Sequence, residues 1–123
     1  MNTQQRLDAS MELLERSNEE FNRGGNTMIA AELLWGAYAQ LSLALAELRG
    51  WPASGHGAYR NTATNLRDLQ GTERWVSDWA AAERLHSHFY QDNLSANELR
   101  TARRATTQGT IELGRIINDE ASR

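Results

Sequence analysis

The sequence predicts an all-α fold, and three observations support this prediction. The chain contains a single proline. Ala, Leu, Glu, Gln and Arg dominate over β-branched runs, which is the composition of helices rather than strands. Apolar residues also recur at steps of three and four over several long segments, as they do in amphipathic helices. Together these features predict an up-and-down bundle of four to five helices.

The first predicted helix covers residues 3 to 22. It has one apolar stripe on an otherwise polar surface, made of Leu7, Met11, Leu14 and Phe21. Gly24 and Gly25 follow the segment and end it. We therefore expect one face of this helix to pack against the rest of the bundle.

The second predicted helix begins at Asn26 or Thr27, either of which can cap it, and runs to Arg49. Gly50, Trp51 and Pro52 then stop it. Two adjoining sides are apolar: the first carries Met28, Ala31, Trp35, Tyr38, Leu45 and Leu48, and the second carries Ile29, Leu33, Ala37, Leu41 and Ala44. Such a helix must be covered from two sides.

The stretch from Met28 to Leu48 is long enough to suggest a membrane span. It contains Glu32, Gln40 and Glu47, however, and a charge at bilayer depth is costly. The sequence therefore favours a buried helix of a soluble protein and no membrane association.

Residues 51 to 57 contain Gly, Pro and Ser and predict a loop. A short third helix follows, marked by Tyr59, Ala63, Leu66 and Leu69, and it ends at Gly71. The fourth predicted helix runs from about residue 72 to residue 92, with an apolar stripe at Trp75, Trp79, Ala82, His86 and Phe89. His86 is thus expected to point inward, and His88, two positions on, to point roughly opposite.

The last predicted helix opens with a capping box, in which Ser95 caps the helix and Glu98 reaches back to the cap amide. Its stripe consists of Leu99, Ala102, Thr106, Gly109, Leu113 and Ile116, where Gly109 is expected to permit close approach of a neighbouring helix. Three arginines, Arg100, Arg103 and Arg104, lie off this stripe. They form either a solvated face or a phosphate-binding cluster.

The length of 123 residues predicts one domain, residues 1–123. The polar start predicts no secretory signal, and the absence of cysteine is compatible with the cytoplasm, where we expect the protein to act. A net charge of −3 and a pI of about 5.6 argue against broad nucleic-acid binding. All basic residues are arginine, whose guanidinium suits a local phosphate or carboxylate site.

No complete catalytic motif is present, because the sequence lacks a Walker loop, a strand-linked GxGxxG, HExxH and GxSxG. No histidine pair has the i, i+4 spacing that places two imidazoles on one metal, so we predict no metal and no cofactor. The candidate ligand-binding residues are those whose placement is unusual for a plain bundle: Glu32, Trp35, Arg49, His56, His86 and Tyr90.

Glu32 lies among apolar neighbours, so its carboxylate is expected to be partly buried and to need a partner. His86, on an inward stripe, is the leading candidate for that partner. The pair would either fix helix register or take part in binding or catalysis. Similarly, Trp35 and Tyr90, together with Trp75, Trp79 and Phe89, form either ordinary core or a stacking platform.

Three segments, AELLWGA, RGWPASGH and AERLHSHFYQ, in that order, resemble the PaREP-type proteins of the HEPN superfamily. They lie between residues 31 and 91. The pattern consists of Ala31, Glu32, Trp35 and Gly36, then His56, then Leu85, His86, Phe89 and Tyr90. The resemblance implies a HEPN-like helical bundle that forms a two-fold dimer, in proteins tied to nucleotide binding, toxin-antitoxin pairs or RNA cleavage.

Nuclease members of that superfamily use an arginine followed, after four to six residues, by a histidine. This sequence has that spacing from Arg49 to His56, in the loop after the second predicted helix. The resemblance would instead place it near LHSHFYQ, where no arginine stands at the required distance before His86 or His88. A ribonuclease is therefore the enzyme class to consider, without a complete motif to establish it.

The sequence thus favours a HEPN-like homodimer that acts as a non-enzymatic or accessory module. Its expected partner is a nucleotide-type ligand, an RNA or a protein, bound near Glu32, His56, His86 and Tyr90. Two alternatives stay open. The chain is a metal-independent endoribonuclease that uses His86, or Arg49 with His56, or it is a structural subunit whose apolar helix face docks another protein.

Overall fold

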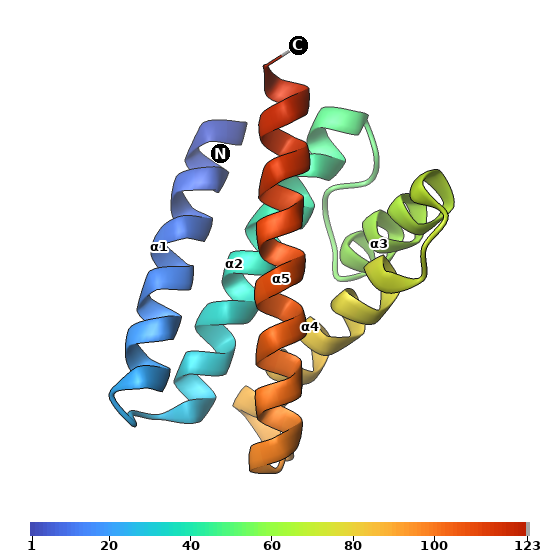
Figure 1. The fold of residues 1–123 in the computed structure, drawn as a ribbon. Helices are drawn as coiled ribbons and strands as arrows, with labels where there is room; N and C mark the ends of the chain where they lie inside the picture. The colour runs from blue at the N-terminus through green and yellow to red at the C-terminus, as the bar shows by residue number, and fades with distance from the viewer. Residues whose placement is uncertain (123) are drawn as a thin grey trace.

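The structure is a computed structural model that describes residues 1–122, and over that range it contains five helices and no strand (Figure 1). The elements are α1 (Thr3–Asn22), α2 (Thr27–Arg49), α3 (Gly57–Gln70), α4 (Arg74–Gln91) and α5 (Ala96–Ala121). The all-α helical bundle predicted from the sequence is confirmed. Arg123, the last residue of the predicted domain, lies outside the described residues.

Helix α2 is the centre of the bundle and packs against α1, α3, α4 and α5. Along the chain, α1, α2, α4 and α5 run alternately down and up in Figure 1, while the short α3 lies beside α4. Many α2 side chains are small and fully buried, including Ala30, Ala37 and Ala44, so the neighbouring helices can come close. The prediction that this helix is covered from more than one side is confirmed.

By length and composition, α2 is also apolar enough to cross a membrane, and 61% of its most apolar window is buried inside the bundle. A largely buried core helix meets the same criteria, so this finding is weak support for a span. The burial agrees with the sequence interpretation of a core helix.

The ends of the helices follow the capping residues in the sequence. Asn26 accepts hydrogen bonds from the backbone N–H groups of Met28 and Ile29 at the start of α2. Ser95 and Glu98 form the predicted capping box of α5. Gly50, with φ of 71°, ends α2 in the left-handed conformation that glycine adopts without strain.

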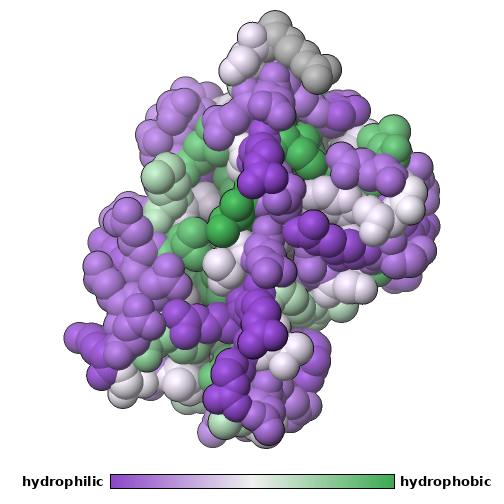
Figure 2. All heavy atoms as spheres, in the orientation of Figure 1, coloured by the Kyte–Doolittle hydropathy of each residue, from purple (hydrophilic) through white to green (hydrophobic). Residues whose placement is uncertain are grey.

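Helix α1 contacts α2 through two buried serines in addition to the predicted apolar stripe, of which Leu7, Leu14 and Phe21 pack against the core. Ser10 and Ser17 are buried, and their hydroxyls donate to the α2 carbonyls of Ala37 (2.8 Å) and Ala30 (2.7 Å). Met11 was predicted to lie on the buried stripe, but it is 64% exposed. It is exposed because α1 packs mainly on α2 and leaves an apolar groove toward α5. Figure 2 shows hydrophobic residues along this groove, which Leu7, Met11, Leu14, Leu41 and Ile111 line.

The buried stripe of α4 shares Trp75 and Ala82 with the predicted stripe but differs from it by one residue at the other three positions. The side chains it buries are Trp75, Asp78, Ala82, Leu85 and His88. The prediction of Trp79, His86 and Phe89 as the inward positions was therefore wrong in detail, since all three are only partly buried. Apolarity misplaced the stripe because two of its true members, Asp78 and His88, are polar. Leu69, one of the apolar residues that mark α3 in the sequence, is 60% exposed in its last turn.

At Gly109, helix α5 comes very close to Asp78 of α4. A Cβ atom at this position would lie 3.0 Å from both Cβ and Oδ2 of Asp78. Such distances are shorter than ordinary van der Waals contact. The prediction that Gly109 permits close approach of a neighbouring helix is confirmed.

Candidate functional site

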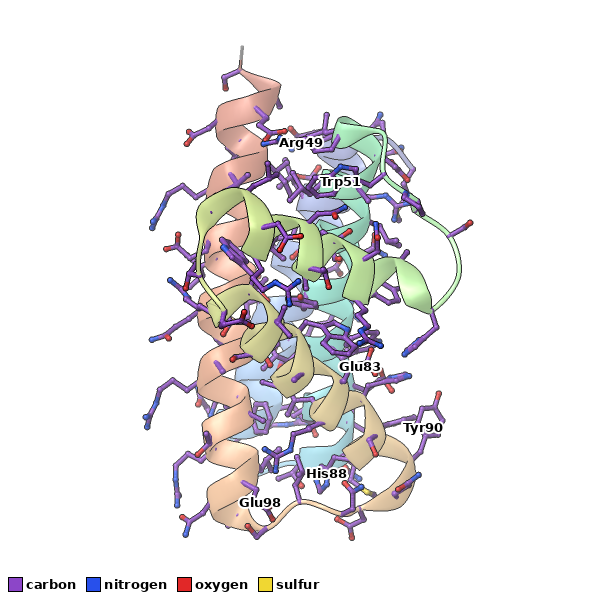
Figure 3. The ribbon with its side chains drawn as sticks, turned by 90° about the vertical axis from the view of Figure 1, so that its right-hand side faces the viewer. Arg49, Trp51, Glu83, His88, Tyr90 and Glu98 are labelled. Carbon is purple, nitrogen blue, oxygen red and sulfur yellow. The ribbon has the colours of Figure 1, made fainter. Side chains whose placement is uncertain are left out.

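Three helices bring the candidate residues together on one side of the bundle. Glu32 and Trp35 lie one turn apart on α2, His56 lies at the start of α3, and His86 and Tyr90 lie one turn apart on α4. Five rings from these helices form what we call the ring cluster: Trp35, His56, Tyr59, His86 and Tyr90. Figure 3 shows Tyr90, together with Glu83, on the side of α4 that is turned away from α5.

The Glu32 carboxylate is paired with the His86 imidazole, as the sequence predicted. Nδ1 of His86 lies 2.7 Å from Oε1 and 3.1 Å from Oε2 of Glu32, and both side chains are about one quarter exposed. In a neutral ring that donates from Nδ1, the second nitrogen, Nε2, is an acceptor. The pair therefore fixes the orientation of the ring and makes Nε2 the nitrogen available to a ligand.

A second carboxylate and imidazole pair lies beside the first. Nε2 of His56 lies 3.1 Å from Oε2 of Glu83 in a hydrogen bond, and 3.0 Å from Oε1 at a less favourable angle. The His56 side chain is 63% exposed, whereas that of Glu83 is 24% exposed. Here Nδ1 is the nitrogen left for a ligand, and the ring sits at the protein surface.

The rings of the cluster contact one another in a continuous set. The His86 ring stacks on Trp35, with centroids 4.8 Å apart and an interplanar angle of 28°. The His56 ring lies 6.1 Å from both Trp35 and His86, within about 31° of parallel. Tyr59 meets Trp35 edge-on at 5.0 Å, and Tyr90 meets His86 edge-on at 5.3 Å. Edge-on and offset contacts of this kind are favourable between aromatic rings.

The ring cluster extends from the buried core to the protein surface. Trp35 is only 7% exposed and belongs to the hydrophobic core, whereas Tyr90 is 70% exposed. Burial raises the pKa of the Tyr59 phenol above its ordinary value; the nearby Arg6 guanidinium opposes this shift and Glu83 adds to it. Tyr59 is therefore a protonated phenol at neutral pH and can donate a hydrogen bond.

Arg49 is the one candidate residue that the structure does not bring to the cluster. Its guanidinium lies beside Glu120 of α5, with Nε 2.7 Å from Oε1, and over the ring of Trp51 at 5.7 Å. This contact joins the carboxyl ends of α2 and α5. Arg49 and His56 thus do not share one site, although seven positions separate them in the sequence.

His88 does not belong to the ring cluster; it is buried and holds the chain where α4 ends. It is 2% exposed, and its Nδ1 accepts a hydrogen bond from the Leu94 backbone N–H at 3.1 Å. Nε2 of His88 is buried without a hydrogen-bond partner in residues 1–122, and the Asp92 carboxylate lies 3.8 Å away. The expectation that His88 points away from the core was wrong, because α4 is covered on two sides and His88 faces the turn into α5.

Two residues of the site, Tyr59 and Glu83, were not predicted from the sequence. Glu83 precedes His86 by three positions on α4, and this spacing places two side chains on neighbouring parts of one helix face. Tyr59 follows His56 by the same interval. Both residues therefore lie three positions from a candidate histidine. This spacing is the signal in the sequence that could have identified them.

The arrangement offers aromatic surface, ring nitrogens and carboxylates to a ligand. Within residues 1–122, no three or more His, Asp or Glu side chains lie together in a way that could hold a metal ion. The site can therefore stack a planar ligand and exchange hydrogen bonds or protons with it through two oriented imidazoles.

Comparison with known protein families identifies this chain's family. The model of the archaeal PaREP1/PaREP8 family matches residues 5–108. The matched range contains all five rings of the cluster and both carboxylates paired with them. No curated protein and no solved structure matches the chain.

Proposed function

We propose that this chain, which belongs to the archaeal PaREP1/PaREP8 family, is a binding module for a nucleotide-type ligand held at the ring cluster. Family membership specifies no ligand, so the proposal depends on the cluster itself. The observation that carries it is the stacked pair of His86 and Trp35 beside the surface ring of His56, with each imidazole oriented by a carboxylate. We also propose that the bundle is HEPN-like. The alternating directions of α1, α2, α4 and α5 support this proposal.

The chemistry of the cluster suits a nucleobase. A planar heterocycle gains about 1 to 3 kcal/mol by stacking on an aromatic side chain, whatever the identity of the base. The exposed faces of His56 and Tyr90 provide such surface, and the free ring nitrogens can exchange hydrogen bonds with the base edge. The net charge of −3 leaves little general attraction for phosphate, so recognition would depend on the base.

A titration followed by NMR of the histidine ring protons tests this proposal. We expect AMP and UMP to shift the His56 and His86 signals, and ribose 5-phosphate, which has no base, to leave them in place. Tyr90→Ala should weaken nucleotide binding about five- to tenfold, because one stacking partner is lost. Leu69→Ala, which removes an exposed apolar side chain from α3, is the matched control. Equal shifts with ribose 5-phosphate and with AMP would contradict a base-recognition site.

A second candidate function, a metal-independent endoribonuclease, is favoured by the two imidazoles, whose ring centroids are 6.1 Å apart. One neutral ring would accept the proton of a ribose 2′-hydroxyl while the other, protonated, donates to the departing 5′-oxygen. Because Arg49 is bonded to Glu120, the catalytic pair would be His56 and His86. We expect RNA cleavage in the presence of EDTA to fall about 100-fold or more in His56→Ala and in His86→Ala, with helical content unchanged. If the unaltered chain does not cleave RNA, the nuclease candidate is excluded and the binding proposal is unaffected.

A further inference from the structure

Three neighbouring arginines on α5 stand out because they have no acidic partner among residues 1–122. The structure describes twelve arginines, and eight of them lie within 4.0 Å of a carboxylate oxygen. Of the remaining four, Arg60 lies alone on α3, and the other three are Arg100, Arg103 and Arg104. In a chain with more acidic than basic residues, such a gathering of unpaired guanidinium groups is not expected from composition.

These arginines line one groove between α5 and α1. The groove has a volume of about 370 Å³, and its lining residues are Asn18, Arg100, Arg103, Arg104, Thr107 and Gln108. No acidic side chain is among them, and the other three offer amide or hydroxyl hydrogen-bond donors. Figure 2 shows a strongly hydrophilic surface along the lower half of α5, where this part of the helix lies.

The central arginine of the three is already held in place. The Arg103 guanidinium lies over the ring of Phe21 at 4.2 Å. It also donates to Oδ1 of Asn18 at 3.3 Å and to Oδ1 of Asn22 at 3.4 Å. Arg100 and Arg104 flank it on the same helix face and are exposed, so their like charges repel without an anion between them.

We infer that the groove between α1 and α5 binds phosphate groups. Guanidinium groups form paired hydrogen bonds with phosphate oxygens, and three of them converge on a space large enough for more than one phosphate. The groove lies on a different side of the molecule from Tyr90 and Glu83, which are turned away from α5 (Figure 3). This inference is therefore independent of the function proposed for the ring cluster.

Tripolyphosphate is the first probe, because it carries phosphate and no base. We expect it to bind the chain at about 50 mM salt, as measured by calorimetry, and to bind at least about tenfold more weakly to the double variant Arg100→Gln/Arg104→Gln. Both replaced side chains are exposed, so the double variant should keep its melting temperature. The control, Arg60→Gln/Arg115→Gln, makes the same change in net charge outside the groove and should bind like the unaltered chain.

A single-stranded RNA of twelve nucleotides is the second probe and identifies the source of the phosphate. If RNA binds more than about tenfold more tightly than tripolyphosphate, the groove takes a nucleic-acid backbone. The slope of log affinity against log salt should then fall by about 1.4 in the groove variant, since each lost contact removes about 0.7. Equal or tighter binding of tripolyphosphate would identify a free oligophosphate as the ligand. The inference is overturned if neither probe binds, or if the groove variant binds both probes as the control does.

Discussion

At the residue scale, burial and charge do not follow the hydrophobicity of the sequence on α4. His88 and Asp78 are 2% and 6% exposed, respectively, whereas the more apolar Trp79 is only partly buried. Within the described part of the chain, Oδ2 of Asp78 has no hydrogen-bond partner, and Nε of Arg74 lies 3.4 Å away. Burial raises the pKa of the Asp78 carboxyl above its ordinary value, with the Arg74 charge opposing the shift. A buried carboxylate that lacks hydrogen bonds reduces the stability of the folded state at neutral pH, when it is charged.

Replacing Asp78 by Asn should stabilise the protein at pH 7 by about 1 kcal/mol, or about 4 °C in melting temperature. Because the folded-state pKa is raised, folding favours the protonated carboxyl. This contribution of Asp78 to the free energy of unfolding is fully present below the pKa of the carboxyl in the unfolded chain. It is lost as the pH rises through the pKa of the carboxyl in the folded chain. The advantage of the variant should therefore shrink as the pH falls toward the acidic range. Thermal melts from pH 4 to pH 8 measure it, with exposed Asp119→Asn as the control. A less stable Asn variant at pH 7 would show that the Arg74 contact outweighs the burial.

At the element scale, small residues and serines let the helices approach closely, in addition to the large apolar side chains that fill the core. Ser10 and Ser17 bring α1 against the alanine-rich surface of α2, and Gly109 brings α5 against Asp78 of α4. A serine hydroxyl that donates to a carbonyl of the next helix satisfies its own hydrogen-bonding need while it is buried. For this reason, a stripe of apolar residues underestimates the true contact surface of α1.

Two glycines of α5 offer a matched test of this close packing. In Gly109→Ala the new methyl group would lie 3.0 Å from Asp78 Cβ, so Asp78 and its helix must shift slightly, and we expect a net loss of about 1 to 2 kcal/mol. In Gly114→Ala the nearest atom, Leu41 Cδ1, is 3.6 Å away, an ordinary contact. That variant should gain up to about 1 kcal/mol from helix propensity. Urea denaturation midpoints measure both, and equal stabilisation by the two substitutions would contradict the packing role of Gly109.

At the scale of the whole molecule, one central helix is enclosed while considerable apolar surface stays outside. Helix α2 is covered by the other four helices, but α1 and α5 leave the groove that contains Met11 and Ile111. These two side chains are 64% and 50% exposed. Exposed apolar surface is what an association with another chain would bury.

The homodimer expected from the family resemblance stays a prediction at this scale. We expect sedimentation equilibrium at micromolar concentration to give twice the 13.8 kDa mass of the chain. The physical reason is that association removes apolar side chains such as Met11 from water. The measurement should be repeated at high salt, where apolar association persists and association through charge is screened. A single species of 13.8 kDa would contradict the dimer.

The sequence by itself determined the helices and most of their ends. The capping residues Asn26 and Ser95, the glycines after α2 and α3, and the period of the apolar residues all act within a few positions of the chain. Such local signals remain readable without the fold. The pairing of Glu32 with His86 could also be predicted, because a partly buried carboxylate needs a partner and few candidates lay on inward positions.

Only the tertiary structure decided which residues share a site. It brought His56 and Glu83, 27 positions apart, into contact, and it placed Arg49 at Glu120, 71 positions away. It also determined that α4 is covered on two sides, which is why His88 is buried and His86 is only partly buried beside His56. These outcomes depend on how the helices cross and which of their faces meet, and the spacing of residues along one helix does not contain that information.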